Sequence, residues 1–251
     1  MRRRARPAAA ALVALALAGC GGGGGGSRRL TVLAASSLTE VFSELGRQFE
    51  RAHPGVEVAF GFASSSSLAE QVVQGAPADV FAAADEASMV RAVAAGRARD
   101  PRVVARNRLA VVVAPGNPAG LSSLADLARP GLVVVLCAPE APCGRLAAAA
   151  LDRAGVALEP ASREPNVKAV VAKVVLGEAD AGIAYETDVR AAGARVQGVA
   201  VAGVDDPSLE AVYATAVVAG TAHAPLARSW VDFVASPAGQ AALARAGFRT
   251  P

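Results

Sequence analysis

The chain has 251 residues, of which 53% are hydrophobic but only 4% are aromatic. This length is sufficient for two compact α/β lobes whose core is built from Ala, Val and Leu, as in parallel sheets covered by alanine-rich helices. The formal charge of +3 is uneven, because four arginines lie within residues 1–6 and the rest of the chain has 21 basic against 22 acidic side chains. No basic stripe with interleaved aromatic residues remains, which argues against nucleic acid as a partner.

Residues 1–19 have the pattern of an export signal. After the basic segment, the apolar stretch 8–18 is shorter than the roughly 20 residues that a membrane span needs. The tetrapeptide ending at Cys20 resembles the bacterial lipobox, in which the cysteine is lipidated after cleavage; a plain secretory signal with an incidental cysteine is the alternative. The glycine-rich segment 20–29 predicts a flexible tether between a lipid anchor at Cys20 and the folded domain.

From residue 30 onward, short apolar runs alternate with helical patterns. Strands are predicted at 30–34, 56–60, 80–84, 109–114, 132–136, 181–185 and 212–219. Helices are predicted around 38–49, 68–73, 89–93, 144–154 and 167–176, followed by two C-terminal helices around Trp230 and from Pro237. The runs at 109–114 and 132–136 are continuously apolar, which is typical of buried parallel strands. This alternation predicts an α/β architecture, in which ligands bind at the carboxyl ends of the strands.

Two serine-rich segments lie at predicted strand-to-helix junctions. The first contains Ser37, and the second contains Ser65 within a run of four serines. Ser37 and Glu40 also fit a capping box, so an ordinary helix cap is the alternative for the first segment, and a polar loop for the second. Free N–H groups and the dipole at a helix start attract anions, and serine hydroxyls can donate as well. Because both junctions open on one edge of the same sheet, we interpret them as an anion site.

Cys137 and Cys143 flank a short turn that contains prolines. Outside the cytoplasm such a pair can oxidise, and we predict a disulfide if the turn brings the Cα atoms within about 7 Å. Closing so small a loop stabilises the fold by only about 2 kcal/mol, so its main effect is to fix the local backbone. Two reduced, buried thiols are the alternative. A metal-ion site is not expected, because two cysteines and two scattered histidines provide no ligand spacing.

Three further residues offer neutral donors near helix starts or strand ends. Cys143 and Val167 each offer a backbone N–H, although Asn166 is a good capping residue in an ordinary helix start. The hydroxyl of Tyr185 can donate to a ligand or bond a local partner. A fully deprotonated tetrahedral oxyanion only accepts hydrogen bonds, and charge-assisted bonds contribute about 1.5–3 kcal/mol each. The donors therefore favour such a dianion over protonated phosphate, which needs an acceptor.

Four stretches, at residues 35–39, 62–69, 75–81 and 182–185, resemble the substrate-binding proteins of bacterial molybdate ABC transporters. The resemblance runs from about Leu30 to the C-terminus. It implies a two-lobed periplasmic-binding-protein fold of type II, with a mostly parallel sheet flanked by helices in each lobe and a two-strand hinge. We place lobe 1 at residues 30–108 and 215–251, lobe 2 at 109–214, and the hinge near Leu109–Val113 and Tyr213–Ala219.

The resemblance also implies a ligand set for molybdate or tungstate, with molybdenum bound only as the oxyanion. The donors would be the hydroxyls of Ser37, Ser65 and Tyr185 and the backbone N–H groups of Cys143 and Val167. The family more often has Ala at the position of Cys143, and a shorter preceding loop leaves Gly144 as the alternative donor. No catalysis and no cofactor are expected. The implied partners are an importer permease, its ATPase subunit and the membrane, with the protein a monomer outside the cytoplasm.

Other readings remain open at this point. Sulfate or thiosulfate can occupy the same fold, and tungstate matches molybdate in size and charge. An extracellular serine hydrolase is a remote alternative, because the Gly-x-Ser-x-Gly elbow is absent and the only histidines are His53 and His223. A structural surface lipoprotein without a ligand is the third.

Overall fold

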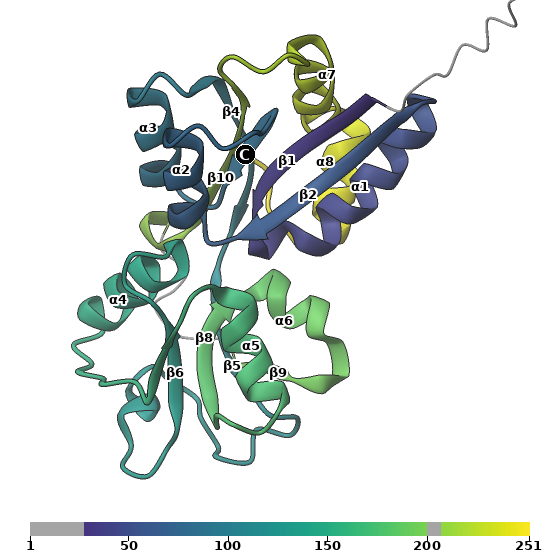
Figure 1. Ribbon diagram of the computed structural model, residues 1–251. Coiled ribbons are helices and arrows are strands. Elements are labelled where there is room, and N and C mark those ends of the chain that lie inside the picture. Colours follow the sequence, from purple (N-terminus) through teal and green to yellow (C-terminus); the bar gives the residue numbers. More distant parts are fainter. Residues whose placement is uncertain (1–27, 200–206) are drawn as a thin grey trace, which may run out of the picture.

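The computed structural model describes residues 28–199 and 207–251, which form two lobes that are each built on one five-stranded sheet (Figure 1). The predicted signal peptide, Cys20 and most of the predicted tether lie outside the described residues. Arg28 and Arg29, which we placed in the tether, are instead the first residues of strand β1. Within the described ranges, no helix is both long and apolar enough to cross a membrane.

The sheet of lobe 1 has the strand order β2-β1-β3-β10-β4. Its strands are β1 (Arg28–Ala35), β2 (Val56–Ala63), β3 (Val80–Ala83), β4 (Ala98–Asn107) and β10 (Ala211–Val218). Strand β1 pairs in parallel with β2 and β3, whereas β10 pairs antiparallel with both β3 and β4. One strand, β10, therefore runs against the other four.

Helices cover both faces of the lobe 1 sheet. They are the 3-10 helix η1 (Ser36–Leu38) and α1 (Thr39–Ala52), α2 (Ser65–Val73), α3 (Glu86–Ala94), α7 (Ala224–Ala235) and α8 (Pro237–Arg245). Side chains alternate along β1, so Leu30 and Val32 face α1, α7 and α8, while Leu33 faces α2 and α3. Trp230 is fully buried in the first group, with its ring edge-on to Phe42 at 5.6 Å. The segments that follow the strands of lobe 1 are therefore attached to a well-packed core.

Lobe 2 repeats the arrangement with the strand order β7-β6-β8-β5-β9. Its strands are β5 (Leu109–Val113), β6 (Val134–Cys137), β7 (Ser162–Glu164), β8 (Ala181–Tyr185) and β9 (Gln197–Val199). Its helices are η2 (Ala125–Ala128), α4 (Pro142–Arg153), α5 (Val167–Val175), α6 (Glu186–Ala192) and η3 (Gly193–Arg195), and η4 (Pro207–Leu209) precedes β10. Strand β6 is parallel to β7 and β8, whereas β5 is antiparallel to β8 and β9.

The prediction that residues 109–114 form a parallel strand is wrong. Strand β5 pairs antiparallel with β8, with Leu109 opposite Tyr185. All five residues of β5 are buried, so its continuous apolar run reflects burial on both faces rather than the direction of pairing. In each sheet the reversed strand is the one that follows a passage of the chain between lobes, and therefore no βαβ crossover precedes it.

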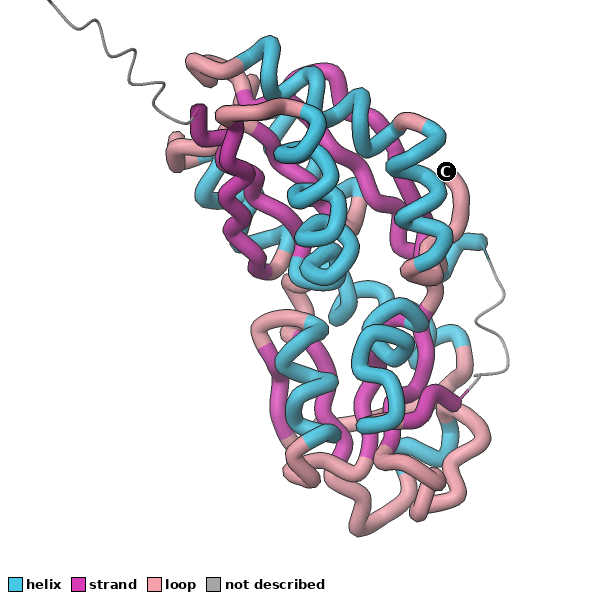
Figure 2. Tube along the Cα trace, turned by 90° about the vertical axis from the view of Figure 1, so that its right-hand side faces the viewer, coloured by secondary structure: helices cyan, strands magenta, loops and turns pink. Residues whose placement is uncertain are grey.

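The segments that join the lobes lie beside the strands that we had assigned to the hinge. The chain leaves lobe 1 at Arg108, between β4 and β5, and is again part of lobe 1 at β10. Figure 2 shows the two lobes one above the other. Strand β10 pairs with β4 from Ala211, opposite Asn107, to Val218, opposite Ala98. The predicted lobe boundary at residue 215 therefore falls inside β10, and lobe 1 resumes at Ala211.

Candidate functional site

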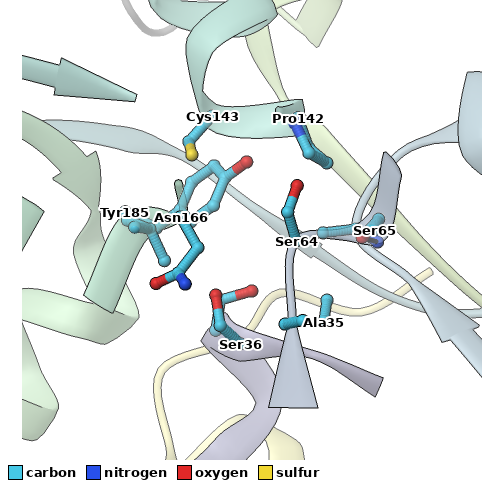
Figure 3. Close-up of a pocket in the computed structure, with 12 residues that line it drawn as sticks. Ala35, Ser36, Ser64, Ser65, Pro142, Cys143, Asn166 and Tyr185 are labelled. Atoms are coloured by element: carbon cyan, nitrogen blue, oxygen red, sulfur yellow. Dashed lines mark hydrogen bonds between the residues drawn. The ribbon is translucent and has the colours of Figure 1, made fainter. Parts of the chain in front are cut away.

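All five residues predicted to bind an anion line one cavity between the lobes. The cavity is narrow, and the centre of a water molecule could move within about 10 Å³ of it. Small and polar residues line it from lobe 1 (Ala35, Ser36, Ser37, Ala63, Ser64, Ser65 and Ala84) and from lobe 2 (Pro142, Cys143, Asn166, Val167 and Tyr185). Figure 3 shows the labelled residues of the two lobes facing each other across this space. Among the described residues that form the lining, none has a carboxylate or a cationic side chain.

The topology of the two sheets explains why the cavity lies here. In lobe 1 the residues follow the ends of three neighbouring parallel strands, β2, β1 and β3. In lobe 2 the lining residues follow β6 and β7, and Tyr185 is the last residue of β8. These three strands are again parallel neighbours. The carboxyl ends of parallel strands meet at one edge of a sheet, where helix N-termini also point. The two edges face each other, so residues from the ends of six strands converge.

Ser65 is fully buried at the start of α2, and its hydroxyl has a fixed partner. Its Oγ accepts a hydrogen bond of 2.8 Å from the backbone N–H of Ala84, the residue that follows β3. This bond uses a lone pair and leaves the hydroxyl hydrogen for another acceptor. Ser65 is therefore oriented by the protein and still able to donate into the cavity.

Ser37 is bonded to a residue that the sequence did not single out. Its Oγ lies 2.9 Å from the hydroxyl oxygen of Tyr213 on β10, and Asn107 Nδ2 donates to the same tyrosine oxygen at 3.4 Å. The capping-box alternative is wrong, because α1 starts after Leu38 without a side-chain cap and Glu40 bonds Lys168 instead. The 3-10 turn η1 between β1 and α1 moves Ser37 out of the capping position and into the cavity wall.

Tyr185 has a hydroxyl group without a hydrogen-bond partner among the residues that the structure describes. Its Oη is buried, and Figure 3 shows it directed toward the space between the lobes. Burial, together with the nearby Tyr213 and Asp188, raises the pKa of Tyr185 well above its usual value, so the hydroxyl keeps its proton. A buried polar group without a partner is unfavourable by about 1–3 kcal/mol, which points to an acceptor that completes the site.

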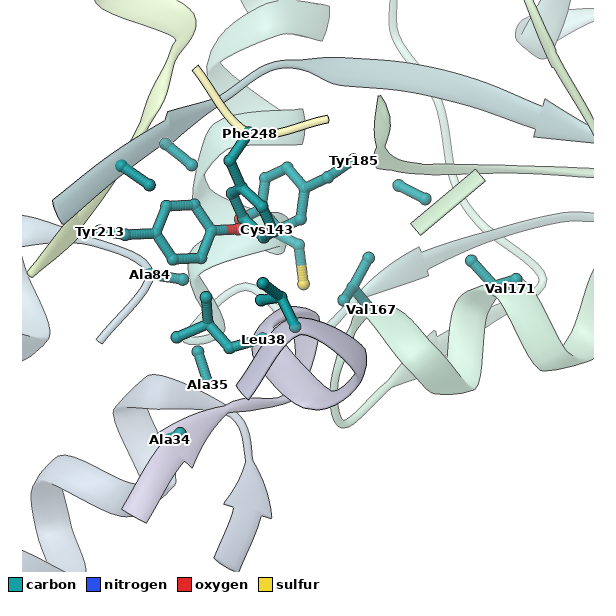
Figure 4. Packing of buried hydrophobic residues seen from close by; sticks show 14 of the residues in the cluster. Ala34, Ala35, Leu38, Ala84, Cys143, Val167, Val171, Tyr185, Tyr213 and Phe248 are labelled. Carbon is teal, nitrogen blue, oxygen red and sulfur yellow. The ribbon is translucent and has the colours of Figure 1, made fainter. Parts of the chain in front are cut away.

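Lobe 2 also offers two backbone donors at helix starts. Helix α4 has no side-chain cap, and because Pro142 has no N–H, Cys143 is the first residue of the helix that can donate. Of the two donors left open by the sequence, Cys143 lines the cavity. At the start of α5, Asn166 Oδ1 accepts from the N–H of Ala169 at 3.2 Å, which is the ordinary helix cap that the sequence left open as the alternative. Val167, the next residue, lines the cavity. Figure 4 shows Cys143, Val167 and Tyr185 near one another.

The predicted disulfide between Cys137 and Cys143 is present, with Cα atoms 5.8 Å apart. Cys137 is the last residue of β6, and Cys143 is the second residue of α4. The disulfide therefore connects the sheet of lobe 2 to the helix start that faces the cavity.

Charged residues lie beside the cavity, and ion pairs join the lobes. Lys168 of lobe 2 bonds both oxygens of Glu40 of lobe 1, at 2.8 and 2.7 Å, and lies 3.0 Å from Asp188 Oδ1. Burial raises the pKa of Asp188 to about 6, although Lys168 opposes the shift. Burial also disfavours the charged form of Lys168, but Asp188 and Glu40 outweigh it and raise the pKa of Lys168. Arg145 of lobe 2 pairs with Asp85 of lobe 1.

Known proteins of similar sequence support the interpretation of the cavity between the lobes as a ligand site. The model of the bacterial extracellular solute-binding protein family matches residues 30–249. The chain belongs to this family. The molybdate-binding protein ModA of Mycobacterium tuberculosis H37Rv is 43% identical over 229 residues, covering 90% of this chain and 86% of the relative. Members of the family are extracellular proteins, so the chain acts outside the cytoplasm.

Two solved structures of solute-binding proteins have the same two-lobed fold. The periplasmic molybdate-binding protein of Azotobacter vinelandii has a TM-score of 0.75 at 22% identity, covering 88% of this chain and 99% of that one. The sulfate-binding protein SubI of M. tuberculosis H37Rv has a TM-score of 0.74 at 24% identity, covering 89% and 87%. At these identities the likeness concerns the fold alone.

The histidines of this family member do not support the hydrolase alternative. His53 stacks on Phe49 with ring centroids 4.0 Å apart, and His223 Nδ1 lies 3.2 Å from Asp79 Oδ1. Neither lines the cavity that contains the serines. Within the described ranges, no group of three or more His, Cys, Asp or Glu residues could hold a metal ion.

The sequence did not reveal the residues that hold the predicted serines in position. Tyr213, Asn107 and the N–H of Ala84 orient the predicted serines, but each lies far from them along the chain. Asn107 also donates to Thr187 Oγ1 of lobe 2 at 2.7 Å. The alternating pattern around Tyr213 predicts a strand and carries no sign of its partner, so no local signal could have found this network.

Proposed function

We propose that the protein binds molybdate, and tungstate equally well, in the cavity between its lobes and delivers it to an ABC importer. The observation that carries this proposal is the buried, unpartnered hydroxyl of Tyr185 in a cavity of neutral donors. Such a site lacks only an acceptor. The protein needs no cofactor for this role, and the ligand is cargo rather than a resident group.

The chemistry of the lining supports a fully deprotonated tetrahedral dianion. Phosphate retains a proton near neutral pH and needs a carboxylate or another acceptor, which the described lining residues do not offer as a charged group. Molybdate accepts hydrogen bonds at every oxygen. The starts of α2, α4 and α5 add partial positive charge, which favours an anion without a neutralising side chain.

The relatives support molybdate over other oxyanions. The mycobacterial relative that is 43% identical over most of the chain is a molybdate-binding protein. The sulfate-binding neighbour is similar in fold only. Sulfate is smaller than molybdate, so a cavity that fits molybdate leaves longer hydrogen bonds to sulfate.

Calorimetric titration of the purified protein with molybdate, tungstate, sulfate and phosphate tests the proposal. We expect molybdate and tungstate to bind with similar affinity, sulfate to bind at least about tenfold more weakly and phosphate not to bind measurably. Tight sulfate binding without a response to molybdate would refute the choice of cargo.

Serine variants locate the site. We expect Ser65→Ala to weaken molybdate binding by about tenfold or more, because it removes a donor to a charged ligand. Ser67→Ala in the same serine run is the matched control, since Ser67 is exposed and does not line the cavity. Equal affinity of both variants and the wild type would rule out this cavity as the site.

We extend the proposal to the N-terminal segment and the partners. Lipidation of Cys20 would hold the monomeric domain at the outer face of the cytoplasmic membrane, where it meets the permease and its associated ATPase. Replacing Cys20 with serine in the full chain should move the protein from the membrane fraction to the soluble fraction and abolish labelling by fatty acid. Retention of the Cys20→Ser variant in the membrane fraction would contradict the anchor.

A further inference from the structure

The start of helix α4 supplies an oxyanion donor without help from a capping side chain. Ala141 is the N-cap residue and has no polar side chain, and Pro142 has no N–H. Cys143 is therefore the first donor of the helix, and it lines the cavity. The direction of its N–H depends on how the first turn of α4 is held against the rest of lobe 2.

The disulfide holds this turn to the sheet. Cys137 does not line the cavity, but it ends β6, where it pairs with Glu164 of β7. The next residue, Ala138, donates its N–H to the carbonyl oxygen of Glu164 at 2.8 Å. Strand β7 leads directly to the Val167 donor at the start of α5. The sulfur bridge thus sets the Cys143 donor relative to the strand pair that also positions Val167.

A close backbone contact seats the turn at its other end. A Cβ atom at Gly144 would lie 2.0 Å from the carbonyl oxygen of Ala138 and 2.9 Å from that of Cys137. Only glycine allows the first turn of α4 to rest on the chain that leaves β6. The turn itself contributes one bond, from Ala141 N–H to the Ala138 carbonyl at 2.9 Å.

We propose that the Cys137–Cys143 disulfide positions the Cys143 N–H for oxyanion binding, so that breaking the bridge lowers affinity for the anion. Cys137 is then a positioning residue that acts on the ligand through its partner. This inference rests on the proposed function. Both cysteines are buried, at 1% and 3% exposure, so the bridge is shielded from thiols while the protein is folded. During folding, a dithiol reductant can give two electrons and two protons to the S–S bond, which yields two thiols while the reductant becomes a disulfide.

The test compares the wild type with the double variant Cys137→Ala/Cys143→Ala, which has no free thiol at the site. Calorimetry with sodium molybdate should show about tenfold weaker binding by the double variant, the effect of misplacing one hydrogen bond to a charged ligand. Leu151→Ala is the control, because it removes a buried side chain at the far end of α4 and away from the cavity. It should lower stability while leaving affinity within about twofold.

The NMR signals of backbone amides distinguish a displaced Cys143 N–H from a general loss of order in the protein. In the wild type, molybdate should shift the ¹⁵N–¹H signals of Cys143 and Val167. In the double variant the Val167 shift should persist, while the shift at position 143 shrinks. Wild-type protein refolded with dithiothreitol provides the same comparison without substitutions, in case the double variant does not fold.

The outcomes distinguish the two proposals. No molybdate binding by the oxidised wild type would overturn the proposed function. Binding by the wild type, with equal affinity in the double variant, would overturn only the positioning role. An equal loss of affinity in Leu151→Ala would also overturn it, since stability alone would then account for the effect.

Discussion

The hydroxyl of Ser37 lies 2.9 Å from the hydroxyl of Tyr213, although 176 positions separate the two residues in the sequence. Tyr213 lies on the strand by which the chain re-enters lobe 1, and its ring is edge-on to that of Tyr185, 6.3 Å away. The two tyrosines differ in one respect. The hydroxyl of Tyr213 is bonded within the protein, whereas that of Tyr185 is not.

Tyr213→Phe should therefore reduce both stability and anion affinity. Removing the hydroxyl deprives Ser37 and Asn107 of a buried partner, which should lower the free energy of unfolding by about 1–2 kcal/mol. Ser37 then loses its fixed orientation, and we expect molybdate affinity to fall about fivefold. Urea denaturation and calorimetry measure the two effects. Unchanged stability would show that this hydrogen bond contributes nothing to the fold.

Tyr185→Phe should have the opposite effect on stability. The substitution removes a buried hydroxyl that has no partner in the empty protein, so the free energy of unfolding should stay the same or rise by about 1 kcal/mol. Affinity for molybdate should fall by about tenfold to a hundredfold, because a donor to a charged ligand is lost. Tyr213→Phe is the natural comparison. A large loss of stability in Tyr185→Phe would mean that its hydroxyl is bonded within the empty protein.

Glu40→Gln should weaken the contact between the lobes. Glu40 of lobe 1 bonds Lys168 of lobe 2, and because both are partly exposed the pair is worth only about 0.2–1 kcal/mol. We expect molybdate affinity to fall about twofold to fivefold at low salt, and less at high salt. Glu44→Gln on the same helix is the matched control, since Glu44 pairs with Arg245 inside lobe 1. An equal effect in both variants would argue against a contribution between lobes.

Stability should depend on pH through Asp188. Burial raises its folded pKa to about 6, from an ordinary value of 3.8, against the opposing charge of Lys168. A raised carboxyl pKa gives a contribution that is complete below the unfolded pKa and is lost as pH rises through the folded one. The raised pKa of Lys168 adds no pH dependence in this range, because the amine stays charged throughout.

Comparison of the wild type with Asp188→Asn measures this contribution. Between pH 4 and pH 7 the unfolding free energy of the wild type should fall relative to that of the variant, on the order of 2–3 kcal/mol. Urea denaturation at each pH unit provides the curve. A difference that stays constant across this range would contradict the raised pKa.

Local patterns determined most of the secondary structure and the membership of the site. Hydrophobic periodicity depends only on neighbouring residues, so strands such as β1 and β8 and most of the helices could be predicted from the sequence. The strands β4, β7 and β9 and the helix α6 were not predicted. Ser37, Ser65, Cys143, Val167 and Tyr185 could be grouped because the family resemblance implies this set and because strand ends and helix starts lie at one edge of each α/β sheet. The disulfide was predictable because its two cysteines are separated by only one short turn.

Pairing between distant segments was decided by the tertiary structure alone. The direction of β5 depends on the path of the chain between lobes, and its apolar run is compatible with either direction. Tyr213 bonds Ser37, and Lys168 bonds Glu40. The residues around one member of each pair give no indication in the sequence of the other member. Burial of Asp188 and Tyr185, which raises their pKa values, arises only in the folded tertiary structure.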